Sequence, residues 1–94
     1  MSVSLSPGER MFDPDYDLFL DILAAGSISA AARARGASVA SCSKRLVRLE
    51  QRIGARLVQR TTRRLSLTPA GKDLADTLLP MRAGIALAEQ RISG

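Results

Sequence analysis

The side chains of this chain that are best suited to chemistry are basic. Residues 33–64 hold ten basic side chains and one acid, Glu50, so this segment carries a formal charge of +9, whereas all 94 residues together carry +5. So basic a segment attracts a polyanion, because contacts to phosphates release condensed counterions. Arginine outnumbers lysine twelve to two, and a guanidinium is a rigid fork of donors that matches phosphate oxygens and guanine edges. The charge therefore predicts binding to nucleic acid.

The residues needed for other chemistries are scarce. The chain has no histidine and a single cysteine, Cys42, so we expect no internal disulfide, no metal site and no cofactor. Cys42 is the one thiol that could act as a nucleophile, and its place on an apolar stripe favours packing over catalysis. We therefore do not expect an enzyme. No apolar run is long enough to span a membrane and no secretory signal is visible, which indicates a cytoplasmic protein.

A helix over residues 38–54 must position much of this charge. Its apolar residues follow the 3.6-residue period, with spacings of 4, 3 and 4, and predict a buried face: Cys42, Leu46, Leu49 and Ile53. Ser38 is the expected N-cap and Gly54 the expected stop. The opposite face begins with small side chains and becomes cationic, which suits a DNA major groove. The alternatives are a surface helix with solvated charges and a membrane-surface helix, although the latter would need Trp or Phe on the apolar face.

Two more helices are predicted before the basic one. Residues 14–25 form the first, with Asp13 as its N-cap. Residues 27–35 form a short, alanine-rich second helix that begins at the N-cap Ser27. Because only a short turn separates it from residues 38–54, the two helices make a helix-turn-helix in which the second would enter the major groove.

A hairpin is predicted after the basic helix. Leu57, Val58 and residues 65–67 have strand character, and Thr and Arg side chains fill the positions between them. The tip of such a hairpin, called the wing below, suits phosphates or a narrow minor groove, where the enhanced negative potential attracts arginine. A solvated turn between two edge strands is the alternative.

A long helix is predicted over residues 69–92, with Thr68 as its cap. Its apolar residues are spaced 4, 3, 4, 3 and 4, which is the a/d seam of a coiled coil: Leu74, Leu78, Met81, Ile85, Ala88 and Ile92. A helix about 36 Å long cannot bury this seam against so small a domain, so we predict that it pairs with a second copy in a homodimer. Pro80 removes a backbone donor and clashes with the preceding turn, which predicts a kink.

The order of these elements resembles the N-terminal DNA-binding domain of LysR-type transcriptional regulators. The resemblance covers residues 16–92, and its motifs are DLFLDILAAGSISAAA, then RLE with the following Gly54, then LVQRTTRRLSLTPAGK. It implies a mainly α fold: a winged helix-turn-helix with three helices and a two-stranded wing, followed by a dimerising linker helix. It also implies a bacterial, nucleoid-associated regulator that binds double-stranded DNA at pseudo-palindromic promoter sites.

Transferred residue by residue, the resemblance implies a set of DNA-contacting side chains. They are Ser27 and Ser29 near phosphates; Val39, Ala40, Ser43 and Lys44 in the major groove; and Arg63 on the wing, with Arg60 and Arg64 as neighbours. Ser38 and Arg48 of the basic helix and Thr62 of the wing are further candidate contacts, expected from their positions beside these residues. The sequence departs from the family at three positions. Gln is often found where this chain has Val39, and a valine cannot bond to a base although it could touch a thymine methyl group. Leucine is usual where Arg35 stands, and phenylalanine where Val58 stands.

The chain is thus expected to divide into a flexible leader (1–12), a winged helix-turn-helix (13–68) and a linker helix for dimerisation (69–94). The family's effector-binding domain has no counterpart in these 94 residues, so we expect either a fragment or a short protein without a small-molecule effector site. The predicted function is sequence-specific DNA binding in transcriptional regulation. A winged-helix module for protein interaction, without specific DNA binding, is the alternative.

Overall fold

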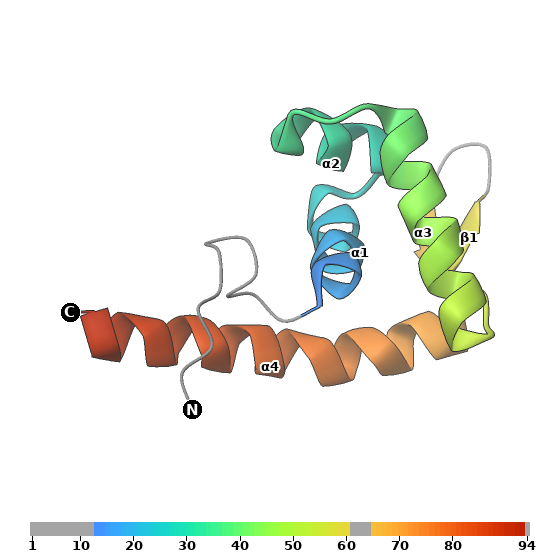
Figure 1. The fold of residues 1–94 in the computed structure, drawn as a ribbon. Helices are drawn as coiled ribbons and strands as arrows, with labels where there is room; N and C mark the ends of the chain where they lie inside the picture. Colours follow the sequence, from blue (N-terminus) through green and yellow to red (C-terminus); the bar gives the residue numbers. More distant parts are fainter. Residues whose placement is uncertain (1–12, 61–64, 94) are drawn as a thin grey trace.

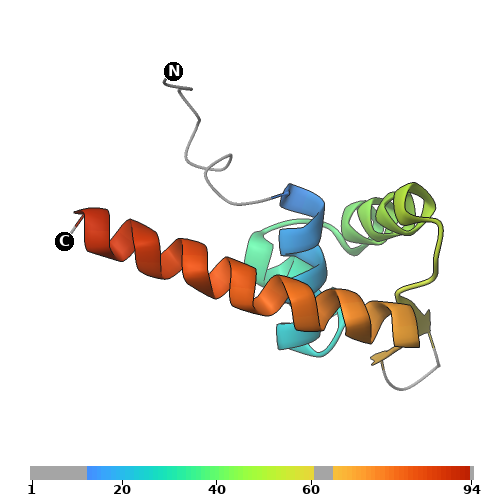
Figure 2. The same cartoon turned by 90° about the horizontal axis from the view of Figure 1, so that it is seen from below.

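The computed structural model describes residues 13–60, without the side chain of Arg60, and residues 65–93. The elements follow the order α1 (Pro14–Ala25), α2 (Ile28–Arg35), α3 (Val39–Ile53), β1 (Val58–Arg60), β2 (Leu65–Leu67) and α4 (Pro69–Ser93). Helices α1, α2 and α3 form a cluster, and α4 crosses beneath it and extends beyond it toward the C-terminus (Figures 1 and 2). The expected winged helix-turn-helix with a long C-terminal helix is therefore confirmed.

The helices begin where the sequence predicts because side-chain oxygens accept bonds from the free backbone N–H groups of the first turn. Asp13 accepts from Asp15 N at 2.9 Å. Ser27 accepts from Ala30 N at 3.0 Å, and Ser38 Oγ accepts from the backbone nitrogen of residue 41 at 3.1 Å. Glycines end all three helices with φ between 66° and 85°, a conformation that costs glycine little.

The core lies where α1, α2 and α3 meet the hairpin and the first half of α4. Its largest fully buried side chains are Phe19, Leu18, Leu20, Ile22, Leu46, Leu49, Leu57, Val58 and Cys42. Three of the four residues predicted for the buried face of α3 are in this core. The fourth prediction, Ile53, is wrong, because that side chain is 39 % exposed. Ile53 is the last residue of α3, and the chain leaves the helix there before it re-enters the core at Leu57.

The two short strands form an antiparallel pair in which Val58 faces Leu67 and Arg60 faces Leu65. Thr68 then joins the hairpin to α4. Its backbone N–H donates to Leu57 O at 3.1 Å, and its Oγ1 accepts from Gly71 N at 3.0 Å, which confirms the predicted cap. The hairpin and the start of α4 are therefore held as one unit.

Helix α4 runs without interruption through Pro80 (Figures 1 and 2), so the proline does not end the helix, and the kink stays a prediction. The predicted seam divides into two parts. Leu78 is buried in the core of its own chain and Leu74 packs against that core, so these two residues are already covered. Met81 and Ile92 are exposed.

Candidate nucleic-acid interface

The outer face of α3 presents the predicted base-reading residues to solvent. Val39 is 47 % exposed and Val47 is 37 % exposed. Ala40, Lys44 and Arg48 are exposed as well, and Ser43 is half-buried. A shallow, open hollow lies along this face, and its lining residues are Ala40, Ser41, Ser43, Lys44, Arg45, Val47 and Arg48. The structure therefore brings Ala40, Ser43, Lys44 and Arg48 together on one surface, as predicted for a groove-facing helix.

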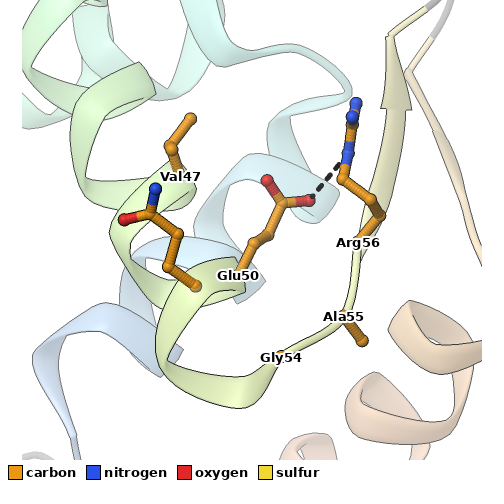
Figure 3. Close-up of a pocket in the computed structure, with 6 residues that line it drawn as sticks. Val47, Glu50, Gly54, Ala55 and Arg56 are labelled. Atoms are coloured by element: carbon orange, nitrogen blue, oxygen red, sulfur yellow. Dashed lines mark ion pairs between the residues drawn. The ribbon is translucent and has the colours of Figure 1, made fainter.

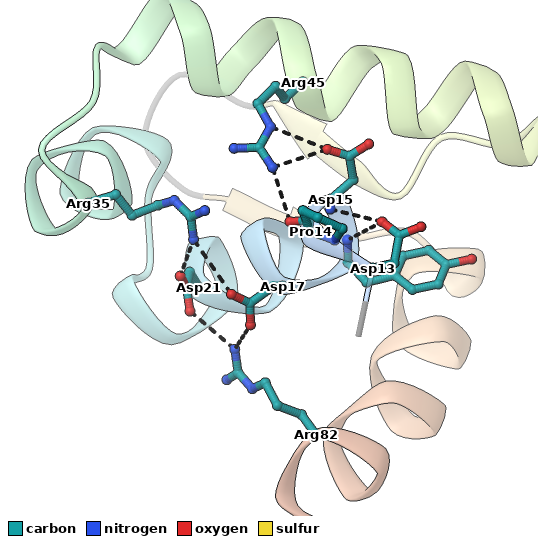
Figure 4. A network of polar contacts seen from close by, with 9 residues as sticks. Asp13, Pro14, Asp15, Asp17, Asp21, Arg35, Arg45 and Arg82 are labelled. Atoms are coloured by element: carbon teal, nitrogen blue, oxygen red, sulfur yellow. Dashed lines mark hydrogen bonds and ion pairs between the residues drawn. The ribbon is translucent and has the colours of Figure 1, made fainter. Parts of the chain in front are cut away.

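Two arginines of α3 point the other way and hold α3 to α1. Arg45 donates to Asp15 Oδ1 at 3.2 Å from both Nε and Nη2, and to Pro14 O at 3.1 Å (Figure 4). Arg52 pairs with Asp13 Oδ2 at 2.9 Å and lies over the Tyr16 ring, 5.2 Å from its centroid. These contacts make two of the helix's three guanidinium groups structural links.

The pKa of Arg52 is raised above its ordinary value. Desolvation lowers it, but the charge of Asp13 and the hydrogen bond to that carboxylate more than offset this effect, with smaller contributions from Tyr16 and Asp15. The Arg52 guanidinium therefore stays charged opposite Asp13.

A second network joins α1, α2 and α4 through two aspartates of α1 (Figure 4). Arg82 of α4 donates from Nη1 to Asp17 Oδ1 at 3.0 Å and to Asp21 Oδ1 at 3.1 Å. Arg35 of α2 donates to Asp21 as well and approaches Asp17 Oδ2 at 3.9 Å. Arg35, where the sequence departs from the family, therefore has partners in the structure. It shares the carboxylates of Asp17 and Asp21 with Arg82 of the linker helix.

These pairings correct the charge that the sequence predicts for the interface. Four arginines of residues 33–64 have acidic partners within 4.0 Å: Arg35, Arg45, Arg52 and Arg56. Within the described part of that segment, Arg33, Lys44 and Arg48 have no ion pair. The net charge of +9 already counts Glu50, and it still overstates what a polyanion would meet, because Asp13, Asp15 and Asp21, which lie outside this segment, neutralise part of it.

Glu50 is a structural residue that the sequence analysis missed. It is 7 % exposed, and its Oε2 accepts from Leu57 N at 2.8 Å and from Val58 N at 3.4 Å. In Figure 3 the carboxylate points across a small hollow toward Arg56, whose Nε is 3.8 Å from Oε2. The side chain thus fixes the start of the hairpin against the end of α3. Its position as the single acid of a very basic segment was the signal that could have identified it.

The predicted phosphate-contacting serines lie at helix starts. The hydroxyl oxygens of Ser27 and Ser38 are occupied as N-cap acceptors, and each hydroxyl retains its hydrogen as a donor. Ser29 is exposed in the first turn of α2. All three are therefore compatible with the predicted role, and Ser27 and Ser38 have a capping role as well.

The predicted wing contacts and the predicted leader lie outside the described part of the chain. Thr62, Arg63 and Arg64 lie outside the described residues, as does the side chain of Arg60. Residues 1–12, predicted as a leader, lie outside them too.

Three further findings concern the thiol, metal ligands and membrane helices. Cys42 is buried at 1 % exposure, as its place on the apolar stripe predicts. Within residues 13–60 and 65–93, no group of three or more Cys, Asp or Glu side chains is arranged to hold a metal ion. None of the helices in the same ranges has the length and apolar character that would let it cross a membrane.

Comparison with known proteins identifies a family. The family described as "Bacterial regulatory helix-turn-helix protein, lysR family" matches residues 15–72. A curated relative, the probable HTH-type transcriptional regulator LtrA of Klebsiella pneumoniae, is 44 % identical over 61 residues, which are 65 % of this chain and 20 % of that protein. The chain thus spans about a fifth of the length of that relative.

Solved structures show the same fold. The full-length virulence activator AphB of Vibrio cholerae is 28 % identical and matches with a TM-score of 0.76, over 83 % of this chain and 27 % of that one. Full-length LysG of Corynebacterium glutamicum is 31 % identical with a TM-score of 0.76, over 85 % of this chain and 28 % of that one.

Proposed function

Because the chain belongs to the lysR family of bacterial regulatory helix-turn-helix proteins, we propose that it recognises specific sequences of double-stranded DNA as a homodimer in the cytoplasm, at the nucleoid. Its family members are DNA-binding transcriptional regulators. The finer features of the proposal are the groove that α3 enters, the contribution of the wing, and dimerisation through α4.

The observation that carries the proposal is the division of the basic side chains on α3. Arg45 and Arg52 are held by Asp15 and Asp13 at the start of α1. Lys44, Arg45 and Arg48 line the open outer hollow, and of these three Lys44 and Arg48 have no acidic partner among the described residues. A helix that served only for packing would have no need to keep charges unpaired around such a surface. Unpaired cations on the second helix of a helix-turn-helix are well placed for phosphates and guanine edges in the major groove.

Dimerisation through α4 rests on the seam residues that the domain leaves uncovered. Met81 and Ile92 are exposed, and Ile85 and Ala88 are half-buried, so a second copy of α4 would remove their apolar surface from water. Two copies related by a two-fold axis would present two α3 helices, which is why the target sites are expected to be pseudo-palindromic. On the wing, Arg60, Thr62, Arg63 and Arg64 would contact the flanking DNA backbone or minor groove.

The test is binding to duplex DNA across a salt series, with selection and sequencing of the duplexes that remain bound. Sequence-specific binding by a dimer should enrich an inverted repeat and fall steeply with salt. Lys44→Ala or Arg48→Ala should weaken binding to the selected duplex about tenfold or more. If Lys44 and Arg48 contact phosphates, each alanine variant should also reduce the slope of log affinity against log salt concentration by roughly one per half-site.

Arg91→Ala is the matched control, because Arg91 is an exposed arginine in the last turn of α4. It loses the same charge and should leave the selected sequence and its affinity nearly unchanged. Equal losses for Arg91→Ala and Arg48→Ala would mean that only net charge matters, which would refute the assignment of α3 to the groove. Absence of any enriched sequence would refute specific recognition.

A further inference from the structure

An exposed apolar strip runs along α3 beside the unpaired cations Lys44 and Arg48, and part of it lines the same hollow as these cations. Its members are Val39, Ala40 and Val47, with Ser43 between them. At about 100° of rotation per residue, all four fall within about 100° of arc around the helix. The core side of α3 is occupied by other residues, namely Cys42, Leu46 and Leu49. The two valines therefore lie outside the core and leave apolar surface exposed.

Single exposed apolar residues are common on protein surfaces, so their position decides whether these valines matter. Val47 lines the hollow that also contains Lys44 and Arg48. It also lines the adjacent hollow near Glu50. Val39 is the first residue of α3, and the N-terminal residues of such a helix are those that reach base edges. A valine also lowers helix propensity relative to alanine without any packing gain at an exposed site.

The chemistry of a valine side chain narrows its possible target in DNA. It has no donor or acceptor, so it cannot bond to the polar groups of a base edge. In the major groove the one apolar feature of a base pair is the 5-methyl group of thymine. We propose that α3 recognises thymine methyl groups through this strip, with Val39 as the principal contact and Val47 as a second one, about 12 Å further along the helix. The inference rests on the proposed function, since it assumes that α3 enters the major groove.

Replacing thymine by deoxyuridine removes only the methyl group and keeps the hydrogen bonds of the base pair. The probe is the duplex that the wild-type chain selects from a random pool, and each of its thymines is replaced in turn. We expect at least one thymine per half-site at which the replacement weakens binding about fourfold, the value of one buried methyl-sized group. Replacement in both half-sites should weaken binding by roughly the square of that factor if a dimer binds.

The protein variant Val39→Ala connects this effect to one side chain. It should weaken binding to the unmodified duplex about as much as the deoxyuridine does. At the sensitive position it should make binding indifferent to the methyl group, because two changes that remove the same contact are not additive. Ile53→Ala is the matched control, since Ile53 is a similarly exposed apolar residue of α3 outside the strip. It should keep the full sensitivity to deoxyuridine.

Two outcomes would overturn the inference while leaving the proposed function intact. One is a selected duplex whose thymines can all be replaced with less than a twofold change in affinity. The other is a Val39→Ala variant that retains the full sensitivity at every position. If the wild-type chain selects no sequence at all, the proposed function itself fails and the inference fails with it.

Discussion

The carboxylate of Glu50 offers the sharpest test of how the hairpin is attached to α3. Glu50→Ala removes the acceptor for Leu57 N at 2.8 Å and for Val58 N at 3.4 Å. Both backbone groups belong to residues that are at most 1 % exposed. Water therefore cannot replace the lost acceptor without disturbing the core, and the two N–H groups stay unpaired.

The size of the effect follows from these contacts. A hydrogen bond to a charged acceptor contributes about 1.5–3 kcal/mol, and the longer contact to Val58 N adds a smaller amount. The ion pair with Arg56 at 3.8 Å adds little, because that arginine side chain is 69 % exposed. We therefore expect Glu50→Ala to lower the free energy of unfolding by about 3 kcal/mol. For a domain of this size that corresponds to a fall in Tm of roughly 12–24 °C.

Glu50→Gln removes the negative charge but keeps an acceptor oxygen in the same place, so it measures the contribution of the charge alone. The amide oxygen can still accept from Leu57 N, but a neutral acceptor is about half as strong as a charged one. We expect this variant to lose about 1–1.5 kcal/mol, between the wild type and the alanine variant.

The assay is urea unfolding followed by circular dichroism, with Glu89→Ala as the control. Glu89 is an exposed glutamate on α4, and its replacement should change stability by less than about 0.5 kcal/mol. If Glu50→Ala loses less than about 1 kcal/mol relative to this control, the buried carboxylate does not hold the hairpin and the reasoning is wrong.

Two more predictions concern α4. A Cβ on Gly71 would lie 1.9 Å from Leu57 O, whereas a Cβ on Gly84 would meet nothing within 4 Å. Gly71→Ala should therefore destabilise the fold by about 2 kcal/mol or more, while Gly84→Ala should stabilise it by up to about 1 kcal/mol; equal shifts in thermal unfolding would contradict the close approach of α4 to the hairpin. Arg82→Ala should lower the free energy of urea unfolding by about 1 kcal/mol, because its half-exposed bonds to α1 are partly screened by solvent; a loss no larger than that of Arg91→Ala would show that this network does not hold the linker helix.

The sequence by itself determined the elements and their order. The N-caps at Asp13, Ser27 and Ser38, the helix periods and the turn residues are all signals within a few residues of the groups they act on. Local signals of this kind act without the rest of the fold, so all four helices and β2 were predicted close to their observed bounds, whereas β1, expected at Leu57 and Val58, covers Val58–Arg60. The outward face of α3 could also be predicted from its helical period. Ile53 is an exception, because the period does not show how far along α3 the other elements of the core extend.

The tertiary structure decided which charges remain available for a partner. Arg45 meets Asp15 across 30 residues, and Arg82 meets Asp17 across 65. Such pairs depend on how the helices pack against one another, and this packing cannot be predicted from the residues near each arginine. Without them, every arginine of the basic segment looks equally free, although several hold the fold together. The same reason explains Glu50: its two backbone partners come within reach only when the chain after α3 turns back toward the helix.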